Sequence, residues 1–360
     1  MYPVTEALGI PHHYVDLPLR MPMHHQPLRD RHHRRLHTSL PHIRRLIDIN
    51  AVPPRTMKAI HIDKFITDLA SIQPKDVPSP QPRNPKDLHI QITHAAITHV
   101  DLLYAQGLHQ NNRRHVQPPF ILGTEFSGIV TSAPQTSSFQ PGTRVFGGGL
   151  GSFAEEICVD EGSVRMVPSQ WSNAEACAVG ASGAVSYGAL VSVCAVKPGD
   201  TVLVLGASGG LGVMAIQIAK ALGAGVIAVV GGKEKGDMVK SIGADVVIDY
   251  HKGKWEEKVK DLTPGKEGVE VVYDAIGAVE SGLKCLKYRG RLVIVGFAAR
   301  GGKMENVRAN RILLKSAMVH GYVSAALNAI FLHLTKCSAS VKMEDMTLGE
   351  RRMYGMASWV

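Results

Sequence analysis

The sequence lacks a run of apolar residues long enough to cross a membrane. A spanning helix needs about 18 or more predominantly apolar residues, and no stretch of this 360-residue chain stays uninterrupted for that length. We therefore expect no membrane partner and a cytoplasmic location. A mitochondrial location is the alternative if the N-terminal segment is a targeting sequence.

Cysteine is scarce, and no two cysteines are spaced as Cys-x-x-Cys. The five are scattered and odd in number: Cys158, Cys177, Cys194, Cys285 and Cys337. This pattern argues against a disulfide framework and against a structural zinc cluster. It fits free thiols in a reducing compartment.

The first 56 residues lack Lys and any sustained apolar period, and they are rich in Arg, His and Pro. They hold eight Arg and four acidic residues, so nearly half of the chain's net charge of +9 lies there. An Arg-rich, acid-poor leader is compatible with a mitochondrial presequence, but its prolines oppose an amphipathic helix. We expect residues 1–56 to be a disordered or targeting extension, or an over-extended reading frame before Met57. The small excess of charge elsewhere gives no reason to expect nucleic acid as a partner.

From residue 57 to about 167, the sequence has short strands separated by Gly and Pro. Such a pattern is typical of a small β-rich, barrel-like domain. We expect strands within 57–65, 88–97, 120–129, 142–146 and 154–159. We expect a proline-rich loop at 77–80.

A glycine-rich turn, Gly-Ala-Ser-Gly-Gly-Leu-Gly, occupies residues 206–212. The preceding segment, 201–205, is apolar without polar alternation, as in a strand buried on both faces of a parallel sheet. The helix expected after the turn ends at Gly223. Its apolar face comprises Val213, Ile216, Ala219 and Leu222, with Ile218 beside it. Because glycines let backbone N–H groups and a helix N-terminus approach a pyrophosphate, we interpret 197–223 as a mononucleotide-binding unit.

Strands and helices alternate after this turn. The expected strands are 226–230, 245–249, 270–273, 291–296 and 318–323, and the expected helices are 235–242 and 254–262. Together with 201–205 this makes six buried strands. An α/β fold with a doubly wound parallel sheet and right-handed crossovers follows. Beyond Tyr322 the pattern ends, although 325–334 allows one more helix.

Several motifs in this order resemble the zinc-independent quinone oxidoreductase (zeta-crystallin-like) branch of the medium-chain dehydrogenase/reductase superfamily. They include Asp101-Leu-Leu-Tyr104, Pro118-Pro-Phe-Ile-Leu-Gly-Thr-Glu125, Lys197-Pro-Gly-Asp200, the glycine turn, Tyr273-Asp274 and Gly290-Arg-Leu-Val-Ile-Val-Gly-Phe297. The resemblance implies a GroES-like catalytic domain over 57–180 and a Rossmann NADP-binding domain over 181–323. It also implies that nicotinamide binds in the cleft between them, and that two copies form a homodimer through the last Rossmann strand.

The C-terminus departs from the family pattern. Relatives continue beyond the position of Gly321-Tyr322 and return to the catalytic domain, and no such return is recognisable in this sequence. We therefore expect residues 324–360 to be an atypical tail. Loss of the return would expose apolar surface and strand edges, which predicts reduced stability or loss of activity.

The resemblance implies that two metal-ligand positions hold threonine. Zinc-dependent relatives place Cys and His where this chain has Thr98 and Thr124. A neutral hydroxyl is a poor substitute for thiolate or imidazole at Zn²⁺, so we expect no metal. His89, His94 and His99 recur every five residues, a spacing that does not bring three rings to one ion. We interpret them as surface or packed histidines, with a substrate contact by His99 as the alternative.

The residues after the second Rossmann strand predict the cofactor. An NAD enzyme places Asp or Glu there for the ribose 2′-hydroxyl, whereas this chain has Gly231-Gly232-Lys233. Lys233 and Lys235 lie where they could pair with a 2′-phosphate, and the resemblance implies Lys235 with Tyr250 in that role. A merely solvated helix start is the alternative. We predict NADPH, bound by Gly206, Ala207, Ser208, Gly209, Gly210, Leu211, Gly212, Gly231, Gly232, Lys235, Tyr250, Ile276, Gly277, Gly296, Phe297 and Tyr187.

Short-chain dehydrogenases are a competing interpretation of the glycine turn. Gly206, Gly210 and Gly212 also satisfy their glycine spacing, and Tyr250 with Lys254 satisfies Tyr-x-x-x-Lys. In that family the turn opens the chain, whereas here a whole domain precedes it and Tyr250 ends a strand. We therefore reject this interpretation.

Catalysis in this branch needs little acid or base chemistry, because the nicotinamide supplies the hydride and the protein orients the substrate and excludes water. The resemblance implies three catalytic candidates. Tyr104 would hydrogen-bond or protonate a carbonyl oxygen, with simple packing as the alternative. Asp101 is expected to organise its loop rather than transfer a proton, and Thr98 precedes it.

The sequence thus predicts an NADPH-dependent oxidoreductase that transfers hydride to a quinone or an activated alkene, an enone or enal. One alternative is a trans-acting enoyl reductase on polyketide or acyl intermediates. The other is a truncated, non-catalytic nucleotide-binding relative, which could contact RNA.

Overall fold

The computed structural model describes residues 55–113, 115–299 and 305–323. The expectations for residues 1–54 of the N-terminal extension, for the tail over 324–360 with its allowed helix, and for Cys337 lie outside these residues. The extension was expected to reach residue 56, but Thr56 already belongs to the first strand.

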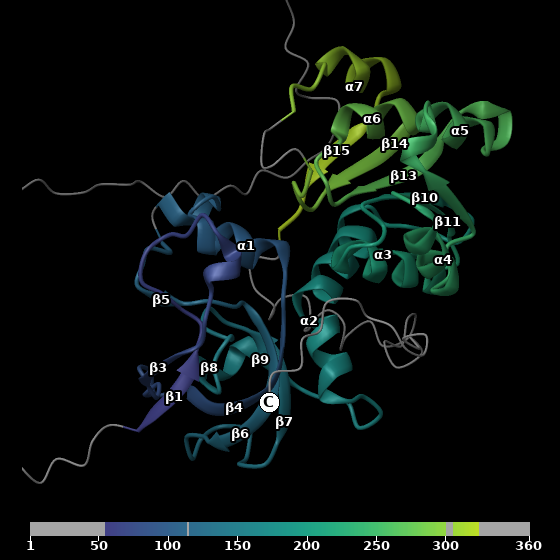
Figure 1. The fold of residues 1–360 in the computed structure, drawn as a ribbon. Helices are drawn as coiled ribbons and strands as arrows, with labels where there is room; N and C mark the ends of the chain where they lie inside the picture. The colour runs from purple at the N-terminus through teal and green to yellow at the C-terminus, as the bar shows by residue number, and fades with distance from the viewer. Residues whose placement is uncertain (1–54, 114, 300–304, 324–360) are drawn as a thin grey trace, which may run out of the picture. The chain divides into compact units, whose positions relative to one another are not determined.

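The first half of the described chain is built on a five-stranded antiparallel sheet (Figure 1). Its strands lie in the order β8, β4, β6, β7, β9. Their bounds are β4 Asp87–Ala96, β6 Glu125–Ser132, β7 Arg144–Gly148, β8 Glu156–Asp160 and β9 Val164–Met166. Leu88, Phe126 and Val145, from three adjacent strands, are fully buried in one cluster. The expected β-rich domain is therefore confirmed.

Two short antiparallel ladders accompany this sheet. They pair β1 (Thr56–Ala59) with β3 (Lys75–Pro78), and β2 (His61–Ile62) with β5 (Phe120–Ile121). The prediction of a loop at 77–80 is wrong for its first two residues. Val77 is buried in the first ladder, and Pro78 is the last residue of β3. Pro78 is tolerated because it occupies the last strand position, where a missing N–H costs little.

The second half forms a six-stranded sheet in the order β12, β11, β10, β13, β14, β15, and every adjacent pair is parallel. The strands are β10 Thr201–Leu205, β11 Gly225–Val230, β12 Val246–Asp249, β13 Val269–Asp274, β14 Leu286–Ile294 and β15 Met318–Gly321. All six expected strands are thus confirmed. The order reverses beside β10, which is the topological switch point of a Rossmann sheet, where ligands bind.

The central strand, β10, shows why residues 201–205 do not alternate between polar and apolar side chains. Val202 and Val204 of β10 pack in the core on one face of the sheet, and Leu203 and Leu205 pack in the core on the other. All four side chains are fully buried. Since helices cover both faces, each position of such a strand must be apolar.

Five helices follow the strands of this sheet: α3 Gly210–Ala221, α4 Lys233–Ser241, α5 Trp255–Asp261, α6 Val279–Cys285 and α7 Ala309–Lys315. The first three confirm the expected helices, whereas α6 and α7 had not been predicted. Ile218 is buried as expected, but the buried face of α3 is wider than expected because it also includes Met214 and Ala215, while Val213 and Leu222 are only half-buried. The reason is that α3 packs against helix α2 as well as against the sheet.

Helix α2 (Asn173–Tyr187) continues into a π-helical segment, Gly188–Val193. Ser172 caps its N-terminus in a capping box with Glu175. The combined helix is long and apolar enough to cross a membrane, but most of it is buried against α3, β6 and β7. This burial is what the core helix of a globular domain requires, and composition alone does not distinguish the two cases.

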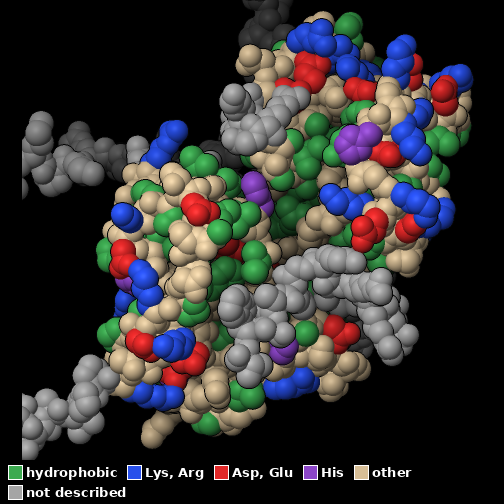
Figure 2. Space-filling view, viewed as in Figure 1, with side chains coloured by type: hydrophobic (Ala, Val, Ile, Leu, Met, Phe, Trp, Pro, Cys, Tyr) green, Lys and Arg blue, Asp and Glu red, His purple; other side chains and the backbone are tan. Residues whose placement is uncertain are grey.

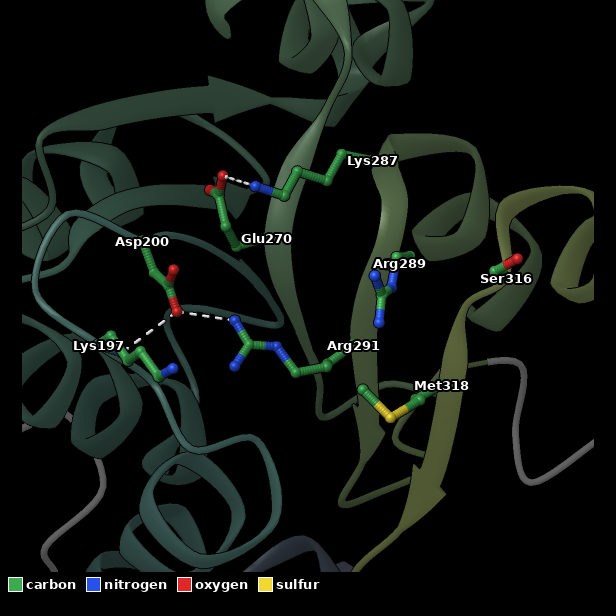
Figure 3. A pocket seen from close by; sticks show the side chains of 8 residues that line it. All are labelled: Lys197, Asp200, Glu270, Lys287, Arg289, Arg291, Ser316 and Met318. Carbon is green, nitrogen blue, oxygen red and sulfur yellow. Dashed lines mark hydrogen bonds and ion pairs between the residues drawn. The ribbon is translucent and has the colours of Figure 1, made fainter. Parts of the chain in front are cut away.

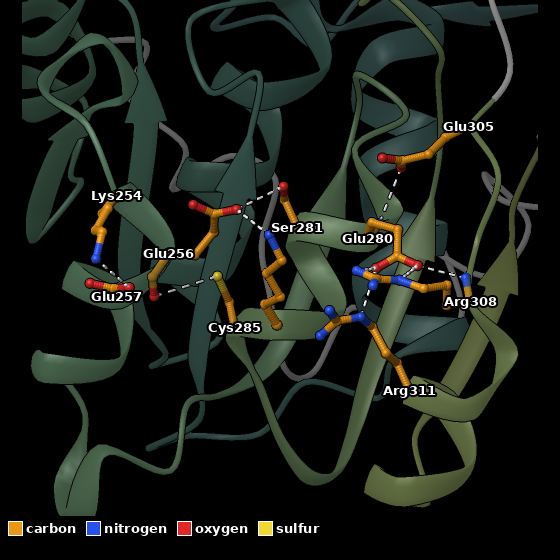
Figure 4. Close-up of polar contacts among 10 residues, drawn as sticks. Lys254, Glu256, Glu257, Glu280, Ser281, Cys285, Glu305, Arg308 and Arg311 are labelled. Carbon is orange, nitrogen blue, oxygen red and sulfur yellow. Dashed lines mark hydrogen bonds and ion pairs between the residues drawn. The ribbon is translucent and has the colours of Figure 1, made fainter.

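The remaining short helices are α1 His99–Gln106 and the 3₁₀ turns Leu69–Ser71, Gln110–Arg113, Glu161–Ser163, Tyr250–Lys252 and Pro264–Lys266. Polar contacts fix the helices on one face of the Rossmann sheet (Figure 4). Glu256 of α5 accepts hydrogen bonds from Ser281 and Lys284 of α6, at 3.0 and 3.1 Å. Glu280 of α6 pairs with Arg308 and with Arg311 of α7. Side-chain contacts therefore join α5 to α6 and α6 to α7.

Candidate functional site

The glycine turn joins the carboxyl end of β10 to the N-terminus of α3. Gly206 adopts a φ of 77°, which favours glycine. Gly209 is the N-cap of α3, no side chain caps the helix, and no acidic residue lies in its first turn. The first N–H groups of α3 are thus left for an anion, and the helix dipole favours one there.

The glycines of this turn are required for different reasons. A Cβ on Gly212 would lie 2.4 Å from the carbonyl oxygen of Gly206 and 2.6 Å from Cα of Ala207, so the helix could not approach the strand. A Cβ on Gly209 would come no nearer than 3.5 Å to any neighbouring atom. Gly212 therefore serves packing, whereas Gly209 keeps the approach to the N–H groups open. The residues present fit a dinucleotide pyrophosphate.

The neighbouring strands β11 and β12 end beside each other. Tyr250 follows β12 and lies against Gly231, where a Cβ would come 2.6 Å from the tyrosine hydroxyl. Lys233 pairs with Asp237 at 2.5 Å. Lys235 is exposed on the same first turn of α4 and has no ion-pair partner among the described residues. Over α4, Figure 2 shows basic side chains beside acidic ones.

An acidic residue does lie near this point, on β12. The Asp249 carboxylate accepts hydrogen bonds from the backbone nitrogens of Gly232, at 3.3 Å, and of His251, at 3.1 Å. The His251 N–H lowers the Asp249 pKa most, and the Gly232 N–H adds to this effect. The His251 imidazole also lies 3.2 Å from this carboxylate, which caps the 3₁₀ turn Tyr250–Lys252.

The carboxyl ends of β13 and β14 lie at the same edge of the sheet as those of β10, β11 and β12. Asp274 is fully buried and accepts hydrogen bonds from the nitrogens of Ile276 and Gly277, at 3.0 and 2.9 Å. Burial raises the Asp274 pKa, and these hydrogen bonds oppose the rise. A Cβ on Gly206 would meet Ile276 at 2.6 Å, and one on Gly277 would meet Phe297 at 2.8 Å. The structure therefore brings the predicted residues 206, 276, 277 and 297 together.

Ser186 was missed by the sequence reasoning. Its hydroxyl donates to the carbonyl oxygen of Leu211, in the first turn of α3, at 3.0 Å, and lies 2.8 Å from the Tyr273 hydroxyl. It therefore links α2 to the glycine turn and to β13. A lone serine in a run of small residues carries no signal for this role. Its neighbour Tyr187, a predicted cofactor contact, is only 3% exposed and packs in the core.

The catalytic candidates Thr98 and Asp101 lie at the start of α1. Thr98 is the N-cap, and its backbone nitrogen and its hydroxyl both donate to Asp101 Oδ2 at 2.7 Å. Thr124 donates to Oδ1 of the same carboxylate at 3.1 Å. Burial raises the Asp101 pKa, and the hydrogen bonds from Thr98 and Thr124 oppose this. The carboxylate is thus fully engaged in holding the loop.

This arrangement bears directly on the metal question. The two threonines at the ligand positions of zinc-dependent relatives donate their hydroxyls to Asp101. His89 instead contacts Thr131, and His94 contacts Thr93. Over residues 55–113, 115–299 and 305–323, no group of three His, Cys, Asp or Glu side chains could hold a metal ion.

Tyr104 is 8% exposed and belongs to a small apolar cluster with Ile62, Ala105 and Leu122. Its ring centroid lies 4.5 Å from that of His109. Burial lowers the His109 pKa, which favours the neutral ring. The Tyr104 ring therefore packs in this apolar cluster and against His109.

Glu125, the first residue of β6, ends one of the family motifs, but the sequence reasoning assigned it no role. It is 6% exposed, and burial together with the nearby Asp101 charge raises its pKa to about 7. The backbone nitrogen of Ala181 donates to its Oε2 at 3.1 Å. A carboxylate that opens a buried apolar strand is the signal that could have identified it.

Comparisons with known proteins agree with this geometry. Residues 84–169 match the family described as alcohol dehydrogenase GroES-like domain, and residues 210–337 match zinc-binding dehydrogenase. Quinone oxidoreductase-like protein 2 of Bos taurus is 36% identical over 248 residues, covering 68% of this chain and 69% of the relative.

A solved structure and a larger protein are also similar. The Escherichia coli quinone oxidoreductase complexed with NADPH has a TM-score of 0.69 and 26% identity, covering 79% of this chain and 89% of its own. A mycocerosic acid synthase-like polyketide synthase of Mycobacterium tuberculosis is 32% identical over 222 residues, covering 60% of this chain and 10% of the synthase. The protein is thus an NAD(P)-dependent oxidoreductase, and the chain belongs to the quinone oxidoreductase branch of the medium-chain dehydrogenase/reductase superfamily.

Proposed function

We propose that the protein transfers hydride from NADPH to a quinone or to the activated double bond of an enone or enal, without a metal ion. The observation that carries this proposal is the cofactor site. An uncapped helix N-terminus lies beside a strand end that holds two glycines and lysines, where an NAD enzyme would hold an acid.

The preference for NADPH is supported by charge. Lys235 is exposed and unpaired within the described residues, whereas Lys233 is paired with Asp237. Lys235 is therefore the cation left to meet a 2′-phosphate. Tyr250, which lies against Gly231, would pack beside it. Of the acids described near this point, Asp237 is paired with Lys233 and Asp249 accepts hydrogen bonds from backbone N–H groups, whereas Glu234 is exposed in the first turn of α4.

The residues on the substrate side favour a reaction without Lewis-acid assistance. NADPH, when bound, supplies the hydride. Thr98, Thr124 and Asp101 form a closed hydrogen-bonded group in place of ligands that could polarise a carbonyl through a metal. The roles left to the protein are orientation of the substrate and exclusion of water. Tyr104 remains the candidate for a hydrogen bond to the substrate oxygen.

Reduction of an enoyl group on an acyl or polyketide intermediate is the second candidate. It is favoured by the similarity to the polyketide synthase, which covers 60% of this chain. The chemistry is the same hydride transfer to an activated double bond, so the cofactor site does not distinguish the two.

We also propose that two copies pair through β15. This strand forms one edge of the sheet and is hydrogen-bonded only to β14 among the described strands. The nearby apolar side chains of Leu313, Leu314 and Met318 are exposed. An open strand edge flanked by apolar residues is suited to pairing with a second chain. Sedimentation of the full chain tests this: a dimer is expected, and a concentration-independent monomer would contradict it.

The function is tested by a panel of substrates on the full chain. Steady-state rates are measured for simple quinones, enones and an enoyl thioester, each with NADPH and with NADH. Turnover of quinones or enones with NADPH supports the main proposal, and turnover of the thioester alone supports the second candidate. Cofactor binding without turnover of any substrate would instead indicate a non-catalytic relative.

A further inference from the structure

A cavity of about 570 Å³ opens at the amino-terminal edge of the Rossmann sheet. It is lined by Lys197, Asp200, Glu270, Lys287, Arg289, Arg291, Ser316 and Met318 (Figure 3). Lys197 and Asp200 precede β10, and Met318 is the first residue of β15. The glycine turn follows the opposite, carboxyl end of β10. The cavity is therefore separate from the cofactor site by the length of a strand.

Cations outnumber acids around this cavity. Arg291 pairs with Asp200 at 2.7 Å and also donates to the carbonyl oxygens of Cys194 and Ala195. Lys287 pairs with Glu270. Each acid is thus matched by one cation.

Two further cations have no such partner. Within the part of the chain that the structure describes, neither the Lys197 ammonium nor the Arg289 guanidinium has an ion-pair partner. Two positive charges therefore remain in a cavity whose acids are already neutralised. Figure 3 shows both side chains at its lining.

The backbone at Arg289 is unusual. Val269 of β13 pairs with Leu286, and Val271 pairs with Arg291, so residues 287–290 bulge out of β14 opposite Glu270 alone. Within this bulge Arg289 adopts a φ of 59°. That conformation is unfavourable for a residue with a side chain and is easily adopted by glycine. Arg289, which adds an unpaired guanidinium to the cavity, is therefore held in a strained backbone conformation. Such strain is typical of binding sites.

We propose that this cavity binds a polyanionic phosphate group, such as a polyphosphate chain. Its volume lies in the range of small-molecule sites, about 300–1,000 Å³. Guanidinium groups match phosphate oxygens through paired N–H donors, and Lys adds a mobile point charge. The two unpaired cations would balance two ligand charges without breaking the ion pairs of Arg291 and Lys287. The site does not depend on the reaction proposed for the cofactor site.

The test uses inorganic tripolyphosphate and isothermal titration calorimetry on the full chain. NADPH is added in excess, so that it competes for the glycine turn. Arg289→Gly removes the guanidinium and suits the backbone, so it should weaken tripolyphosphate binding by about tenfold or more. The thermal midpoint of unfolding should stay equal or rise, because the positive φ no longer carries a side chain.

Lys197→Ala should also weaken tripolyphosphate binding. Lys64→Ala removes an exposed charge from the β-rich domain and should leave binding unchanged, and so should Lys235→Ala at the cofactor site. The proposal is overturned if tripolyphosphate does not bind. It is also overturned if Arg289→Gly binds it as the wild type does, or if Lys64→Ala weakens it equally. A parallel titration with ATP distinguishes a nucleotide from a free polyphosphate, since only a nucleotide site would prefer ATP.

Discussion

The carboxylate of Glu125 and the backbone nitrogen of Ala181 are joined by a 3.1 Å hydrogen bond at the point where helix α2 is kinked. Gly180 creates the kink with non-helical dihedrals, φ 10° and ψ −128°. A Cβ at that position would lie 2.7 Å from the same carboxylate oxygen. The absence of a side chain therefore lets strand β6 hold the helix through a buried acid.

This buried acid predicts a pH dependence of stability. The pKa of Glu125 is about 7 in the folded chain, against 4.5 for an ordinary Glu. The folded state therefore binds the proton more tightly, and stability is lost as pH rises from about 4.5 to 7. Glu125→Gln should remove this loss, because glutamine does not titrate. Between pH 4.5 and pH 8, the free energy of unfolding of the wild type should therefore fall by up to about 3 kcal/mol more than that of Glu125→Gln.

Urea unfolding of both proteins at pH 4.5 and pH 8 measures this difference. Glu234→Gln, which removes an exposed carboxylate, is the control and should follow the wild type. A stability difference between Glu125→Gln and wild type that is the same at both pH values would contradict the buried-acid interpretation.

Two alanine substitutions in the glycine turn should separate packing from binding. Gly212→Ala places a methyl group 2.4 Å from the Gly206 carbonyl oxygen, and should cost about 1–3 kcal/mol of stability as well as cofactor binding. Gly209→Ala meets no atom nearer than 3.5 Å, so it should leave stability within about 0.5 kcal/mol while weakening NADPH binding. Thermal unfolding and fluorescence titration measure the two effects. Equal loss of stability in both variants would be inconsistent with this division.

The two lysines at the start of α4 should differ in their effect on cofactor choice. Lys235→Ala should weaken NADPH binding by about tenfold, as expected for a lost charge-assisted hydrogen bond, and should leave NADH binding unchanged. Lys233→Ala is the matched control, since Lys233 is already paired with Asp237. Its effect on NADPH should be smaller. The assignment fails if Lys235→Ala weakens both cofactors alike.

Thr98 should matter for stability through its cap. Thr98→Ala removes the side-chain acceptor for the Asp101 nitrogen and a donor to the buried Asp101 carboxylate. We expect a loss of about 0.5–2 kcal/mol in the free energy of unfolding, typical of a lost N-cap. Thr98→Ser keeps the hydroxyl and should restore most of it. Equal destabilisation by both variants would show that the Thr98 methyl group, rather than the cap, is what matters.

The Rossmann half could be predicted from sequence because its signals are local. Strands such as β10 are buried on both faces and therefore uniformly apolar, and the turn needs glycine at positions 206 and 212 for backbone reasons alone. Both signals survive without any knowledge of tertiary contacts. The width of the buried face on α3 could not be predicted, since it depends on packing by α2.

Other features depend on contacts between distant segments. Helix α2 was missed because its run of Ala, Gly, Ser and Val shows no apolar stripe at helical spacing, since it is buried against α3, β6 and β7, and its one local signal is the Ser172–Glu175 capping box. The link from Ser186 to Leu211 and the bond from Glu125 to Ala181 each join segments far apart in sequence. At 77–80, proline suggested a loop, but a strand end tolerates it. Of the predicted site, the cofactor residues near β10 and β13 come together, whereas the roles of Tyr104 and Tyr187 stay predictions.

The central claim is an NADPH-dependent, metal-independent hydride transfer, and one measurement tests it most directly. The full chain is dialysed against a chelator, and kcat/KM for a simple quinone is compared with NADPH and with NADH. We predict turnover that the chelator does not reduce and a kcat/KM at least about tenfold higher with NADPH, the factor expected from one phosphate-binding lysine. Equal or better turnover with NADH, or loss of turnover after chelation that zinc restores, would contradict it.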